Sequence, residues 1–128
     1  MHKLNFSTLI IACLLTPSIP VLANKLDVRI MEEGGGGQLA TCASSTVAGL
    51  SADGDGFLAV RSGPGSQYRK LAELHNGDVV YVFDKKGKWA GVVYGDLESE
   101  ECASINTRPV TNRKKGWVHT KWLKDLAG

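Results

Sequence analysis

The stretch that most constrains the fold runs from Phe57 to Phe83 and alternates short apolar runs with turn-forming residues. Ser62-Gly-Pro-Gly-Ser66 is typical of a tight turn, because glycine allows a positive φ and proline fixes φ and lacks an amide donor. Asn76-Gly77 is the strongest short signal for a two-residue hairpin. The stretch therefore predicts three short strands joined by two tight reversals.

The strands that follow carry much of the predicted core. The run Val79-Val-Tyr-Val-Phe83 is the most apolar, and we expect it to be buried on both sides. A polar hairpin turn leads to a strand that begins at Trp89. The period of two in a strand places Val92 and Tyr94 on one face and Trp89 and Val93 on the other. We expect Val92 to be a core residue.

Shorter segments complete the predicted sheet. Leu71 and Leu74 are expected to face inward from the strand before Asn76-Gly77. Gly116-Trp-Val-His119 is expected to be the last long strand, with Trp117 in the core. Residues 120–124 are too few for a stable helix and predict one tight helical turn. Five or six short strands of this kind can close into a small barrel, which removes exposed edges.

The order and spacing of these motifs resemble a bacterial Src-homology-3-like (SH3b) domain over roughly residues 57–123. The resemblance implies a small SH3-like barrel that serves as a targeting or recognition module for cell-wall peptide or protein segments. Two features depart from the family pattern: Ala59 replaces the usual Asn, and an insertion at 95–115 follows Tyr94. The matching segments are Leu58-Ala-Val-Arg-Ser-Gly-Pro-Gly-Ser66, Asn76-Gly-Asp-Val-Val80, Trp89 to Tyr94, Gly116-Trp-Val-His119 and Trp122-Leu123.

The first 23 residues are expected to be a signal peptide. Leu9-Ile-Ile-Ala-Cys-Leu-Leu15 is an apolar core too short to span a bilayer, and Val21-Leu-Ala23 offers small residues for cleavage before Asn24. The alternative is a lipoprotein signal, because Ile10-Ile-Ala-Cys13 resembles a lipobox, although it lies unusually early. Since no other apolar run approaches a spanning length, we expect a periplasmic or secreted protein without an integral membrane span.

The rest of the chain divides into a linker and one domain. Residues 24–38, which contain the run Gly34–Gly37, are expected to be a flexible linker. Within them, residues 25–31 alternate weakly and could pair as an edge strand. Residues 39–128 are expected to form the barrel domain, all-β and with the insertion at 95–115. One further strand is expected between Gln38 and Leu50.

Cysteine usage predicts one disulfide. Cys13 leaves with the signal peptide, so Cys42 and Cys102 remain as an even pair in an exported chain. The bond closes a loop of about sixty residues, for which the chain-entropy model gives about 4 kcal/mol. Two free thiols or a metal site are the alternatives. Zinc needs three or four ligands, and His75 and His119 stand apart from either cysteine, so no metal and no cofactor is predicted.

Candidate ligand-binding residues lie beside the first turn and in the insertion. The aromatic side chains of Tyr68 and Trp89 offer large contact areas, and Arg61 either fixes the turn or binds an anion. The insertion segregates its charges, with Asp96 and Glu100 near one end and Arg113 and Lys114 near the other. The net charge after removal of the signal peptide is about +1, which argues against nucleic acid as a partner.

No catalytic constellation is visible in the sequence. A cysteine–histidine nucleophile would need a free, activated thiolate, whereas an exported cysteine pair is expected to be oxidised. We therefore expect a non-enzymatic domain that binds cell-wall peptide or another exported protein. The alternative is a periplasmic inhibitor or immunity protein that acts through the 95–115 loop, since segregated charges suit a charged protein partner. The oligomeric state is left open.

Overall fold

The computed structural model of the chain describes residues 25–36, 41–51, 56–95, 102, 104, 106–111 and 114–124. Short strands dominate these residues, and the sole helical element among them is the 3-10 turn η2 (Thr120–Trp122) that the sequence predicted. The strands are β1 (Met31–Glu32), β2 (Ala43–Val47), β3 (Leu58–Arg61), β4 (Lys70–Leu74), β5 (Val79–Lys86), β6 (Trp89–Val93), β7 (Arg108–Pro109), β8 (Lys115–His119) and β9 (Leu123–Lys124).

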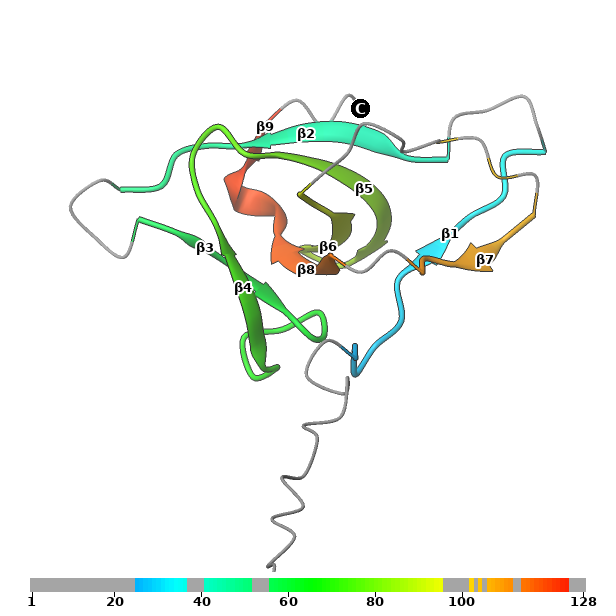
Figure 1. The fold of residues 1–128 in the computed structure, drawn as a ribbon, viewed down its shortest axis with the longest axis horizontal. Helices are drawn as coiled ribbons and strands as arrows, with labels where there is room; N and C mark the ends of the chain where they lie inside the picture. Colours follow the sequence, from blue (N-terminus) through cyan, green and yellow to red (C-terminus); the bar gives the residue numbers. More distant parts are fainter. Residues whose placement is uncertain are drawn as a thin grey trace, which may run out of the picture.

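One antiparallel sheet of seven strands organises the domain. Its order is β4-β3-β8-β6-β5-β2-β9, and β1 pairs with β7 as a separate two-stranded ribbon. Figure 1 shows the main sheet curling around itself, with the β1–β7 ribbon at one side. The predicted all-β class is confirmed. The main sheet has seven strands where five or six were predicted, and its order ends at β4 and β9 rather than closing into a ring.

The concave side of the sheet holds an inner core. Val92 is fully buried there, as predicted, and Leu74 is 5% exposed. Leu71 was predicted to face inward but is absent from this core. The β3–β4 register explains the difference: Leu58 pairs with Leu74 and Val60 pairs with Ala72, so period two turns Leu71 to the other side. The inner core comprises Val47, Leu58, Val60, Leu74, Val80, Val82, Ala90, Val92, Val118 and Leu123.

A second core covers the opposite face of β5, β6 and β8. Trp117 is fully buried, as predicted, and packs in a cluster with Ile30, Phe83, Val93 and Val110. The run predicted to be buried on both sides therefore contributes to both cores, because Val80 and Val82 face inward while Phe83 faces outward. Its first residue is the exception: Val79 is 46% exposed.

The second core, which we also call the outer core, is covered by residues 25–32, here called the arm. Ile30 is 1% exposed, and the Trp117 indole nitrogen donates to the Val28 carbonyl at 2.8 Å. Glu32 is 2% exposed, and its carboxylate accepts from Arg108 of β7 at 3.2 Å. The sequence placed these residues in a flexible linker, with an edge strand over residues 25–31 as the alternative, and the arm contains the short strand β1. Its alternating apolar side chains pack against the sheet, whereas the domain boundaries stay a prediction.

The Asn76-Gly77 turn forms, but the hairpin predicted from it does not. Gly77 has a φ of +93°, and the Asp78 amide donates to the His75 carbonyl at 3.0 Å. The strands on either side nevertheless diverge, since β4 pairs with β3 and β5 pairs with β2 and β6. The Asn76 side chain accepts from the Leu50 amide and donates to the Leu50 carbonyl, both at 3.0 Å. These bonds hold the turn against the end of β2 rather than in a ladder.

The predicted disulfide between Cys42 and Cys102 is present, with a Cα–Cα distance of 4.9 Å. Beside it, the Thr41 amide donates to the Cys102 carbonyl at 3.0 Å. The bond ties the insertion to the strand predicted between Gln38 and Leu50, which is confirmed as β2. Among the described residues, no helix is long and apolar enough to cross a membrane.

Candidate functional site

The turn between β3 and β4 holds two of the predicted site residues together. The Arg61 guanidinium donates to the Tyr68 carbonyl at 3.0 Å, so Arg61 fixes the turn, which is one of the two roles considered for it. The Tyr68 ring lies over Gly63, where an added Cβ would stand 2.5 Å from the ring carbons. Tyr68 is thus half-buried against its own turn, and its part in ligand binding stays a prediction.

Trp89 is the first residue of β6 and faces the outer core. Its ring contact among the described residues is with His119, at 5.4 Å between centroids and an interplanar angle of 73°, rather than with Tyr68. The two residues are cross-strand partners in the β6–β8 register. Edge-to-face stacking of this kind stabilises the strand pair. The structure therefore does not join Trp89 and Tyr68 into one aromatic surface.

The predicted charged residues of the insertion fall largely outside the described part of the chain. Asp96, Glu100 and Arg113 lie there, so the segregated charge pattern stays a prediction. Lys114 is described and exposed, and its carbonyl accepts from the Tyr94 amide at 3.1 Å. Partial burial raises the pKa of the Tyr94 phenol above its usual 10.0, because desolvation disfavours the charged form.

A pocket of about 570 Å³, here called the acidic pocket, opens where β5 runs past the start of β2. Ala43, the first residue of β2, pairs with Val82, and β5 continues to Lys86 without β2 beside it. The arm, the disulfide and the chain before β7 close the space that remains. Its lining consists of Met31, Glu33, Thr41, Cys42, Ala43, Val82, Phe83, Asp84, Lys85 and Thr107.

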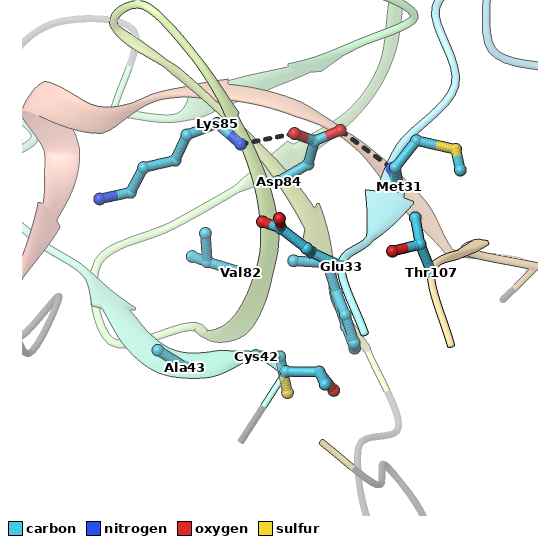
Figure 2. A pocket seen from close by; sticks show the side chains of 10 residues that line it. Met31, Glu33, Cys42, Ala43, Val82, Asp84, Lys85 and Thr107 are labelled. Atoms are coloured by element: carbon cyan, nitrogen blue, oxygen red, sulfur yellow. Dashed lines mark hydrogen bonds between the residues drawn. The ribbon is translucent and has the colours of Figure 1, made fainter. Parts of the chain in front are cut away.

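Asp84 is held in the lining of the acidic pocket by two backbone amides. A bulge interrupts the β5–β6 register between Val82 and Asp84. One carboxylate oxygen of Asp84 accepts from the Met31 amide at 2.9 Å, and the other accepts from the Lys85 amide at 2.8 Å. Figure 2 shows Asp84 between these two donors. The carboxylate thereby joins the arm to β5, and the two bonds fix the position of its negative charge.

The remaining polar groups of the pocket are available to a ligand. Glu33 and Lys85 are exposed, and within the described residues neither side chain has a recorded partner. Thr41 accepts from the Ser104 amide at 3.3 Å and Thr107 accepts from the Gly34 amide at 3.1 Å. Each hydroxyl still has its own proton to donate. The pocket thus combines an apolar floor with two carboxylates, one ammonium and two hydroxyl donors.

Sequence reasoning missed this pocket. Asp84 reads as part of a polar hairpin turn, and Glu33 as part of a linker. The available signal was the apolar alternation of Leu26, Val28 and Ile30, which indicates a strand packed on a surface. Within the described residues, no three His, Cys, Asp or Glu side chains gather as a metal site would require, and the lack of a metal stays a prediction.

The comparisons with known proteins give one family. A family model described as Bacterial SH3 domain matches residues 56–124, which is more than half of the chain. No curated protein and no solved structure matches the chain. The matched range spans β3 to β9, whereas β1, β2 and the arm precede it. The chain therefore belongs to the bacterial SH3 domain family.

Proposed function

We propose that the mature chain is an exported, non-enzymatic module that binds a peptide segment of the cell wall or of another exported protein. The observation that carries this proposal is the acidic pocket. Its volume of about 570 Å³ lies within the usual range for ligand sites. Members of the family generally act as binding modules.

The chemistry of the pocket favours a peptide that carries an ammonium group. Glu33 and Asp84 contribute two negative charges against the single positive charge of Lys85. The apolar floor, which includes Val82 and Phe83, suits the aliphatic stem of such a side chain. The hydroxyls of the two threonines suit peptide carbonyls. We therefore assign the primary contact to this pocket rather than to Tyr68 or Trp89.

Export is part of the proposal, and the disulfide supports it, because such bonds form and persist in oxidising compartments. The intact mass of the mature protein tests it. We expect a chain that starts at Asn24 and is two hydrogens lighter than the reduced form. A diacylglycerol adduct on Cys13 would establish the lipoprotein alternative, and a mass that retains residues 1–23 would contradict cleavage.

Binding is tested with purified peptidoglycan and, in parallel, with periplasmic extract. We expect retention by at least one of them, and weaker retention for Glu33→Gln and Glu33→Lys. Glu73→Gln is the matched control, because Glu73 is an exposed acid on β4, at the opposite edge of the sheet. If the Glu33 variants are retained as well as the wild type while the control behaves normally, the acidic pocket is not the site.

The inhibitor alternative depends on the insertion. Deleting the insertion is not a clean test, because Val110 packs in the outer core and Cys102 forms the disulfide. Neutralising its charges with Asp96→Asn and Glu100→Gln leaves both in place. If these changes abolish capture of a partner from extract while Glu33→Gln does not, the insertion rather than the pocket recognises the partner.

A further inference from the structure

A second cavity, of about 320 Å³, lies between the arm and the chain that leads from β7 into β8. We call it the basic pocket, because three of its lining side chains are Lys25, Arg29 and Lys115. Lys25 and Arg29 are exposed residues of the arm, and Asp27, exposed between them, accepts from the Ser62 hydroxyl. Among the described residues that line the pocket, none is acidic.

The floor of the basic pocket is apolar and largely buried. Ile30 is 1% exposed and Val110 is 9% exposed, and the Val110 amide donates to the Ile30 carbonyl at 2.9 Å. Leu26 and Pro109 extend the apolar lining. The floor is therefore part of the outer core, and a ligand can rest on it without a change in the packing beneath.

The backbone that carries the cations is anchored. The Asp27 and Val28 amides donate to the Ser62 carbonyl at 2.9 and 3.1 Å, and Asp27 also accepts from the Ser62 hydroxyl. The Arg69 guanidinium donates to the Lys25 carbonyl at 2.9 Å. These bonds fix the backbone of the arm at residues 25, 27 and 28, next to the positions that carry Lys25 and Arg29.

Two of the three cations of the pocket, Lys25 and Arg29, carry the argument for a ligand. The side chains of Lys25 and Arg29 have no recorded hydrogen bond or ion pair within the described part of the chain. Clustered charges of one sign beside a low-dielectric surface attract an ion of the opposite sign. An arginine adds two parallel donors that match a carboxylate. An anionic group on an apolar stem satisfies both the cations and the floor.

We propose that the basic pocket binds the C-terminal carboxylate of a peptide whose last side chain is apolar. A free phosphate or a lipid headgroup is also anionic, but neither would place an apolar group against the floor of the pocket. The site is separate from the acidic pocket: the two lie at opposite ends of the β1–β7 ribbon, one beside Glu33 and Thr107 and the other beside Arg29 and Val110.

The test uses two synthetic peptides, acetyl-Gly-Gly-Val with a free carboxylate and the same peptide as its carboxamide. Each is titrated into the isotope-labelled mature protein and followed by the amide resonances. We expect amide resonances of residues 25–30, 110, 111, 114 and 115 to shift with the carboxylate peptide, and affinity to fall by about tenfold or more for the carboxamide. Added salt should weaken binding to the carboxylate peptide.

Matched variants locate the site. Arg29→Gln is expected to lower the affinity by about tenfold, whereas Lys88→Gln, at the exposed β5–β6 hairpin, is expected to leave it unchanged. Circular dichroism melts confirm that each variant is folded. Glu33→Gln is expected to keep this binding, so a failure here is distinguishable from a failure of the acidic pocket.

Three outcomes overturn the proposal. The first is equal binding of the carboxylate and carboxamide peptides. The second is unchanged affinity for Arg29→Gln in the folded protein. The third is co-sedimentation with vesicles of phosphatidylglycerol, lost in Arg29→Gln, without any shift by the carboxylate peptide, which would make the basic face a membrane-binding surface.

Discussion

The packing of Ile30, in the arm, against Gly91 of β6 offers a direct test of how the arm is held. A Cβ added at Gly91 would lie 2.8 Å from both γ carbons of Ile30 and 3.1 Å from the Cβ of Asp84. Ile30 is 1% exposed and packs in the outer core with Phe83, Val93, Val110 and Trp117. Gly91→Ala is therefore expected to displace the arm and to lower the free energy of unfolding by about 1–3 kcal/mol, as overpacking of a core does.

Replacing Ile30 by alanine removes the γ carbons that a Cβ at position 91 would meet. Ile30→Ala alone is expected to cost about 2–5 kcal/mol, because it leaves a cavity in the outer core. In the double variant, the methyl group introduced at position 91 occupies part of the space that the isoleucine side chain vacates, so the clash with Ile30 disappears and the cavity shrinks. The double variant is therefore expected to cost less than the sum of the two single changes, by about 0.5–3 kcal/mol.

Guanidinium denaturation followed by circular dichroism, without reductant, measures the four free energies of this cycle. Gly116→Ala is the control, because a Cβ there would meet Val60 and, at 3.0 Å, the Arg61 carbonyl on the inner side of the sheet. It is expected to destabilise the domain and to be additive with Ile30→Ala. Additivity of Gly91→Ala and Ile30→Ala to within about 0.5 kcal/mol would refute the seating of Ile30 on Gly91.

Two further outcomes are expected. Trp117→Ala is expected to cost about 3–5 kcal/mol, because it empties a fully buried site and leaves the Val28 carbonyl without its donor; a denaturation midpoint that hardly moves would contradict this. The folded-state pKa of Tyr94 is raised above 10.0, so folding favours the neutral phenol. The contribution of Tyr94 to the free energy of unfolding is therefore fully present below about pH 10 and is lost as the pH rises through the folded-state pKa. Tyr94→Phe is expected to lessen this alkaline loss of stability, and an unchanged pH profile of the midpoint would show that Tyr94 does not cause it.

Local patterns were enough to predict the parts of the fold that depend on neighbouring residues. The alternation in β6 placed Val92 and Trp89 on the correct faces, because the period of a strand is fixed by backbone geometry. The disulfide followed from the count of cysteines in the expected mature chain. Of the two roles considered for Arg61, the bond to the Tyr68 carbonyl shows the one that fixes the turn, while anion binding stays a prediction.

Pairings between distant segments could not be predicted in this way. The Asn76-Gly77 turn is local, but its side-chain bonds run to Leu50, 26 residues away, and the strands on either side pair with β3, β2 and β6 rather than with each other. The arm was read as linker because the glycine run dominates its composition, while the slot that receives Ile30 exists only where Gly91 lies beneath it. Neither the Asn76–Leu50 contact nor the Ile30–Gly91 contact can be predicted from the sequence around only one of its two partners.

The covering of the outer face also decides where a ligand can bind. One face of the sheet is closed by the inner core, and much of the other is closed by the arm and by β7, with Trp117 beneath them. A central groove across β5, β6 and β8 is therefore not available. The two pockets lie at the edges of the arm and β7, at opposite ends of the β1–β7 ribbon. One pocket is beside Glu33 and the other is beside Arg29. The arm and the insertion, which lie outside the common family pattern, thus place two pockets of opposite charge on a shared scaffold.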